Sequence, residues 1–141
     1  MKNSIFYADD DIDDLDIFKE VADELSATVS LFDHGEKLLN ALDNPPPQAT
    51  VIFLDLNMPG KSGFDVLKDI KESEAHADKP VVILSTASNM DGVEKCKEMG
   101  AGLYICKPRS MKDLKDAVNY VLNIDWTNFN PSDKEFFYKA Q

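Results

Sequence analysis

The sequence has no long apolar run, no cysteine motif and few basic residues. A membrane-spanning helix needs about 20 consecutive, mostly apolar residues, and no stretch of this chain approaches that length. The amino terminus, MKNSIFYADDD, reaches acidic residues after only a few apolar ones. It is therefore too short for the apolar core of a secretory signal. We expect a cytoplasmic protein with no membrane-spanning segment.

The two cysteines, Cys96 and Cys106, form no CxxC pair and have no evident histidine partner for a metal site. Cys96 falls in a stretch with helical pattern and Cys106 in an apolar run. We therefore expect both to be buried, reduced thiols. Such thiols are typical of a reducing intracellular compartment.

Positive charge is scarce. Fifteen Lys and Arg residues face 26 Asp and Glu residues, which gives a formal net charge of −11. A surface that binds nucleic acid must be cationic to neutralise phosphates. Docking to an anionic membrane also needs a basic cluster. We therefore expect neither nucleic acid nor membrane as a partner.

Five short apolar runs predict β-strands. They are residues 4–8 (SIFYA), 28–32 (TVSLF), 50–54 (TVIFL), 80–85 (PVVILS) and 103–106 (LYIC). The third and fourth runs are continuously apolar and rich in Val and Ile, which is typical of strands buried on both faces of a parallel sheet. An amphipathic helical pattern follows each run. The β-α order, repeated five times, predicts an α/β fold with helices on both faces of the sheet.

Helix starts are marked by capping-box patterns. These pair Asp33 with Glu36, Ser62 with Asp65 and Ser110 with Asp113. The repeated strand and helix patterns predict one domain over residues 1–124, followed by a short extension over residues 125–141. The extension is too short for an output domain. In it, Ser132 and Glu135 could begin one more helical turn.

Polar and charged residues follow the strands at their carboxyl ends, where ligands bind in open parallel sheets. Asp9, Asp10 and Asp11 follow the first strand, Asp55 the third, Thr86 the fourth and Lys107 the fifth. Crowded carboxylates repel one another unless a cation lies among them. Oxygen ligands at this density suit a hard divalent ion such as Mg²⁺. One carboxylate could then act as a nucleophile towards a phosphoryl group, with metal, ammonium and hydroxyl sharing the charge.

Four segments together resemble the receiver domain of bacterial response regulators. They are FYADDD, VIFLDLNMPGKSGFDVL, VVILSTAS and AGLYICKP, in this order and each at the carboxyl end of a predicted strand. The resemblance covers about residues 4–124. It implies a flavodoxin-like three-layer sandwich with a five-stranded parallel sheet of order 2-1-3-4-5.

The resemblance also implies a role for individual residues. Asp55 resembles the aspartate that accepts a phosphoryl group from a histidine kinase or a histidine phosphotransfer protein. Asp10 would hold Mg²⁺ directly, Asp9 largely through water, and Asn57 through its backbone carbonyl. Lys107 and Thr86 would contact the phosphoryl oxygens, Tyr104 would swing inward as a switch, and the bond between Lys107 and Pro108 would be cis. The protein would signal through protein contacts and would not be an enzyme in its own right.

Other interpretations stay open at this point. Asp9 to Asp11 could simply complement a helix dipole, Thr86 could lead a helix, and Tyr104 could be ordinary packing. The whole chain could be an adaptor that is never phosphorylated. It could also be a phosphotransferase or phosphatase with an aspartyl-phosphate intermediate, although such enzymes typically have a second Asp where this chain has Asn57. A calcium loop from Asp9 to Glu20 lacks the glycine expected at its sixth position, where Asp14 stands.

Overall fold

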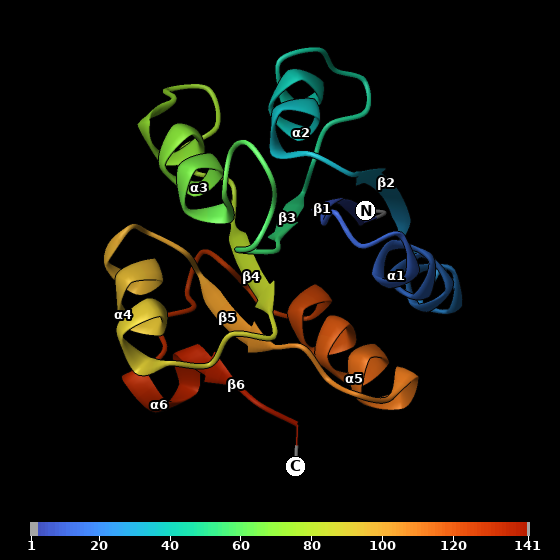
Figure 1. Cartoon of the computed structure of the whole chain (residues 1–141), viewed down its shortest axis with the longest axis vertical. Coiled ribbons are helices and arrows are strands. Elements are labelled where there is room, and N and C mark those ends of the chain that lie inside the picture. The colour runs from blue at the N-terminus through green and yellow to red at the C-terminus, as the bar shows by residue number, and fades with distance from the viewer. Residues whose placement is uncertain (1–2, 141) are drawn as a thin grey trace.

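The computed structural model describes residues 3–140, and its central element is a six-stranded parallel sheet (Figure 1). The strands are β1 (Ser4–Ala8), β2 (Thr28–Phe32), β3 (Val51–Leu54), β4 (Val81–Ser85), β5 (Leu103–Cys106) and β6 (Phe137–Tyr138). Their order across the sheet is β2-β1-β3-β4-β5-β6. The predicted flavodoxin-like order of the first five strands is confirmed. The strands β3 and β4 each begin one residue later than predicted.

Helices cover both faces of the sheet, which makes three layers. The helices are α1 (Ile12–Glu24), α2 (Gly35–Leu42), α3 (Gly63–Glu72), α4 (Met90–Glu98), α5 (Met111–Leu122) and α6 (Asp133–Phe136). Helices α1 and α5 lie on one side, and α2, α3 and α4 lie on the other (Figure 1). Each side has its own apolar core, one built around Phe18 and Val118, the other around Leu38, Leu67 and Cys96. In this part of the chain no helix is long and apolar enough to cross a membrane.

The sixth strand was not predicted. It lies in the extension after α5, where Tyr104 of β5 pairs with Phe137 and Ile105 with Tyr138. A strand of two residues is too short to show an apolar alternation in the sequence. The helical turn predicted in the extension is confirmed, because Ser132 and Glu135 form a complete capping box at the start of α6.

The extension is part of the same packed structure. Phe136 is 2% exposed and belongs to the same core as Tyr104. Trp126 packs against Gly102, where an added Cβ would come within 2.6 Å of the indole ring. Lys97 of α4 forms an ion pair with Asp133 at 2.6 Å. We infer from these contacts that residues 125–140 pack against the domain and stabilise it.

Two of the three predicted helix caps are confirmed. Ser62 accepts a hydrogen bond from the Asp65 backbone N–H, and Ser110 accepts one from Asp113. The cap predicted at Asp33 is wrong, because α2 begins one residue later, after His34. The Asp33 carboxylate instead lies 3.0 Å from the ring nitrogen Nδ1 of His34 and forms an ion pair with Lys37 at 2.8 Å.

The cysteines are both free, as predicted. Cys96 is fully buried, and burial raises the pKa of its thiol to about 12. Cys106 is only partly buried, so the prediction of two buried thiols holds for Cys96 alone.

Candidate functional site

Three carboxylates meet at the carboxyl edge of the sheet. Asp9 follows β1 and Asp55 follows β3, and these strands are paired so that Ala8 lies beside Leu54. The register therefore places Asp9 and Asp55 side by side. Together with Asp10 they bring one oxygen each to within 4.8 Å of one another. The convergence predicted from strand order is confirmed.

Asp9 lies at the bottom of this site. Its side chain is fully buried, which a charged group tolerates only with several partners. It accepts hydrogen bonds from the Tyr7 hydroxyl, from the Asp11 backbone N–H at 3.0 Å and from the Lys107 ammonium at 2.7 Å. Burial and the charge of Asp9 both raise the pKa of Tyr7, so the hydroxyl stays a donor. Asp10, in contrast, is exposed, so ligands can reach its carboxylate from solvent.

Lys107 contacts two of these acids, Asp9 and Asp55, together with Asp14. It directly follows β5, and its backbone N–H donates to the Ser85 carbonyl at 2.9 Å. Its ammonium lies 2.7 Å from Asp9, 2.7 Å from Asp14 and 3.6 Å from Asp55. Burial disfavours the ammonium, but the hydrogen bonds to Asp14 and Asp9 outweigh burial and raise the pKa of Lys107.

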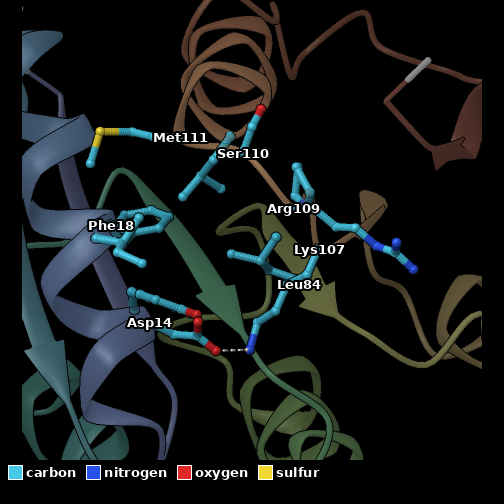
Figure 2. Close-up of a pocket in the computed structure, with 11 residues that line it drawn as sticks. Asp14, Phe18, Leu84, Lys107, Arg109, Ser110 and Met111 are labelled. Carbon is cyan, nitrogen blue, oxygen red and sulfur yellow. Dashed lines mark hydrogen bonds and ion pairs between the residues drawn. The ribbon is translucent and has the colours of Figure 1, made fainter.

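Asp14 is the member of the site that sequence reasoning missed. It lies in the first turn of α1, and Figure 2 shows its carboxylate reaching across to the Lys107 ammonium. Acidic residues in the first turn of a helix are common because they complement the helix dipole. For that reason the sequence contained no signal that singled out Asp14 from its neighbours.

The environment of Asp55 raises the pKa of its carboxyl group. Asp55 is 6% exposed. Burial raises its pKa to about 6; the charge of Lys107 opposes the rise and that of Asp9 adds to it. One Asp55 oxygen accepts a long hydrogen bond, 3.4 Å, from the backbone N–H of Asn57. A carboxyl group with this pKa is largely ionised at neutral pH and can act as a nucleophile.

Gly63 allows the start of α3 to approach the Asp55 backbone. A Cβ at this position would lie 2.3 Å from the Asp55 carbonyl oxygen and 2.7 Å from the Leu56 Cα. Its backbone N–H donates to the Leu56 carbonyl at 3.0 Å. The loop after β3 is thereby held against the first residues of α3, which supports the position of Asp55.

Thr86 and Tyr104 lie beside the site on the β4 and β5 side. Thr86 follows β4 and is exposed, and it lines a hollow of about 690 Å³ together with Lys107. Tyr104 is 1% exposed, and its hydroxyl donates to the carbonyl of Ala87 at 2.6 Å. The Phe137 ring packs edge-on against it, with 5.7 Å between ring centroids. Tyr104 thus occupies an inward position here, and its role as a switch stays a prediction.

The predicted cis bond before Pro108 is wrong. Among residues 3–140, the cis bonds join Pro45 to Pro46 and Pro46 to Pro47, so the bond between Lys107 and Pro108 is trans. A trans bond before proline is the more stable form by about 0.5–1 kcal/mol. Lys107 lies within 4 Å of Asp9, Asp14 and Asp55 with the trans bond, so no cis bond is needed to place its ammonium.

The site fits a hard divalent cation. Its donors are all oxygens, from Asp9, Asp10 and Asp55, and they are close enough for one ion to contact all three. The calcium-loop alternative does not fit, because α1 begins at Ile12 and runs through Glu20 as a regular helix. The roles of Asn57 and Thr86 towards metal and phosphoryl group stay predictions.

Comparison with known proteins agrees with this geometry. Residues 5–119 match the family described as the response regulator receiver domain. The chain is 30% identical to the two-component response regulator ARR17 of Arabidopsis thaliana over 129 residues, 84% of either chain. It is 33% identical to ARR6 of the same plant over 85 residues, 60% of this chain and 46% of ARR6. The chain spans about half the length of several curated relatives, such as ARR3, of which it covers 54%.

Solved structures show the same fold. The phosphorylated cyanobacterial phytochrome response regulator RcpA is 25% identical, with a TM-score of 0.80 over 93% of this chain and 98% of that chain. The Mn²⁺-bound form of the response regulator Rcp1 is 27% identical, with a TM-score of 0.76 over 92% and 99%. Receiver domains of this kind bind a divalent metal and accept phosphoryl groups from histidine kinases or phosphotransfer proteins. The acidic site at the carboxyl edge of the sheet, formed by Asp9, Asp10 and Asp55 and called the edge site below, agrees with this family. The family match and the fold together show that the chain belongs to the response regulator receiver domain family.

Proposed function

We propose that Asp55 accepts a phosphoryl group in a Mg²⁺-dependent reaction, and that the donor is a phosphohistidine of a histidine kinase or a phosphotransfer protein. The observation that carries this proposal is the arrangement around Asp55. Its carboxylate lies beside Asp9 and Asp10, with the Lys107 ammonium 3.6 Å away. A nucleophile, a set of metal ligands and a cation for the transferred oxygens are therefore present in one place.

The transfer is a displacement at phosphorus. An Asp55 carboxylate oxygen attacks the phosphorus atom and forms an acyl phosphate. The bond from phosphorus to the histidine nitrogen breaks, and its electron pair returns to the imidazole. Asp55 must be ionised to attack, and with a pKa of about 6 it is so at neutral pH. The Lys107 ammonium neutralises part of the charge on the transferred oxygens.

Asp9, Asp10 and Asp55 would hold the metal, with the Asn57 backbone carbonyl as a further ligand. A bound Mg²⁺ would supply positive charge next to the phosphoryl oxygens. Asp9 is already held by Tyr7 and Lys107, so its oxygens are fixed before any ion arrives. Asp10 is exposed and is the acid that incoming ligands meet first.

The donor protein would approach over the rim formed by α1 and the start of α5. Apolar side chains are exposed there: Ile12 is 64%, Ile17 38% and Met111 39% exposed. Ile17 and Met111 also line a cavity of about 120 Å³ that Lys107 closes on one side (Figure 2). A histidine delivered to Asp55 must come from a surface that covers this rim, which would remove these apolar groups from water.

The protein would act as a switch and not as an enzyme. The acyl phosphate would be read by other proteins through a changed surface near Thr86 and Tyr104. An adaptor that is never phosphorylated has no need of three converging carboxylates with a partly buried lysine. The arrangement therefore favours the phosphorylated switch over the adaptor.

Intact mass measurement tests this proposal. The protein is incubated with acetyl phosphate and Mg²⁺, and we expect the mass of one phosphoryl group to be added. Asp55→Asn should add none, because the amide is not a nucleophile. Asp16→Asn, an exposed acid on α1, is the matched control and should be modified like the parent. Phosphoryl transfer to Asp55→Asn at the parental level would contradict the proposal.

A further inference from the structure

The Lys107 ammonium is shared unequally among three carboxylates. It donates to Asp9 and to Asp14 at 2.7 Å each, whereas Asp55 lies at 3.6 Å, beyond a good hydrogen bond. An ammonium has three N–H donors. Two of them are therefore used by residues other than the phosphoryl acceptor.

These two partners differ in what they do for the fold. Asp9 is fully buried and also bonded to Tyr7, so its contact with Lys107 compensates a buried charge. The Asp14 side chain is 35% exposed and could be hydrated without Lys107. The bond from Lys107 to Asp14 therefore compensates no fully buried carboxylate, unlike the bond to Asp9.

The position of Asp14 follows from the packing of α1 beside α5. Asp11 caps α1 by accepting from the backbone N–H groups of Asp13 and Asp14, which fixes the first turn. From that turn the Asp14 carboxylate points to the ammonium of Lys107, which directly follows β5 (Figure 2). The ammonium is thus drawn to the α1 side of the edge site, away from Asp55.

A phosphoryl group on Asp55 would compete with Asp14 for Lys107. Its oxygens carry close to two negative charges at neutral pH and are strong acceptors. For Lys107 to give them more than its one remaining donor, the bond to Asp14 must break. The Asp14 charge also repels the phosphoryl oxygens directly. Both effects act in the same direction, against the phosphorylated state.

We propose that Asp14 is a positioning residue that holds Lys107 towards α1 and thereby weakens the binding of a phosphoryl group at Asp55. The inference rests on the proposed function of Asp55 and adds a restraint to it. Asp14 sets how far the equilibrium lies towards the unphosphorylated form. Its removal makes Lys107 available to the phosphoryl oxygens.

Beryllofluoride, a non-covalent phosphoryl mimic, measures this equilibrium. Its affinity is determined by titration with excess Mg²⁺ for the parent, Asp14→Asn and Asp14→Ala. We expect both variants to bind about three- to tenfold more tightly, which corresponds to losing one repulsive charge and one competing acceptor near the site. Asp13→Asn removes the same charge from the same first turn, but Asp13 is exposed and makes no ion pair among residues 3–140. It should change the affinity less than about twofold, because exposed charges are screened.

Thermal unfolding separates this role from a structural one. If Asp14 only stabilises the start of α1, Asp14→Asn should lower the melting temperature as Asp13→Asn does and leave affinity unchanged or reduced. A rise in affinity without a rise in melting temperature is the result that the proposal requires. Unchanged or weaker beryllofluoride binding by both Asp14 variants would overturn it. Failure of the parent to bind beryllofluoride would instead contradict the proposed function of Asp55.

Discussion

Binding of Mg²⁺ to the edge site should depend strongly on pH. The metal and a proton compete for Asp55, whose pKa burial raises to about 6. The carboxyl group is then mostly protonated near pH 5 and mostly ionised near pH 7.5. Because Mg²⁺ binds the ionised form of Asp55, the apparent affinity for Mg²⁺ should rise about tenfold from about pH 5 to about pH 7.5 and stay constant at higher pH.

The size of this change in Mg²⁺ affinity distinguishes a carboxyl group with a raised pKa from one with the usual pKa. With the usual pKa of 3.8, Asp55 would be ionised throughout this range, and the affinity would hardly change. The assay is a Mg²⁺ titration at several pH values, followed through the amide signals of Asp10 and Asn57 by NMR. Asp55→Asn is the control, since its side chain does not titrate. We expect its remaining affinity to lack the step near pH 6.

Two results would refute this reasoning. A flat affinity in the parent would show that burial does not hold a proton on Asp55. The same step in Asp55→Asn would assign the titration to another group, so the environment of Asp55 would not be its cause.

Two further predictions concern the extension and the switch. Phe136→Ala should lower the free energy of unfolding by about 3 kcal/mol, because a fully buried ring is lost from the core. That loss corresponds to a fall of about 10 °C in melting temperature, measured by calorimetry. Lys134 is exposed in the same helix, so the control Lys134→Ala should change the free energy of unfolding by less than about 0.5 kcal/mol. If Phe136→Ala lowers the free energy of unfolding by less than about 1 kcal/mol, the extension is not part of the folded unit. Thr86→Ala should still bind beryllofluoride but show a smaller amide shift at Tyr104 than the parent, and equal shifts would leave Tyr104 as ordinary packing.

Much of the fold could be predicted from the sequence because its signals are local. Continuously apolar runs such as residues 51–54 (VIFL) identify strands buried on both faces, and each is followed by a helical pattern. The alternation requires parallel strands, and parallel strands bring their carboxyl ends to one edge. The meeting of Asp9 and Asp55, with Lys107 beside them, follows from that topology and from residue type.

The features that could not be predicted depend on contacts between distant segments. The β6 strand has two residues, and it exists because the chain returns along β5 after α5. Asp33 and Ser62 have similar capping patterns, yet only Ser62 caps its helix, since Asp33 finds partners in His34 and Lys37.

The sequence by itself determined the class of the fold and the acidic edge with its lysine, and the resemblance to receiver domains implied the order of the five main strands. Tertiary structure alone decided how that lysine is shared. Asp13 and Asp14 are chemically identical neighbours in one helical turn, and only the packing of α1 beside α5 brings Asp14 to within 2.7 Å of Lys107. Tertiary structure alone also decided the surroundings of Tyr104, because Phe137 of the distant extension packs against its ring. Periodicity and residue type act along the chain, whereas the choice between equivalent side chains depends on which of them lies next to Lys107 in the folded protein.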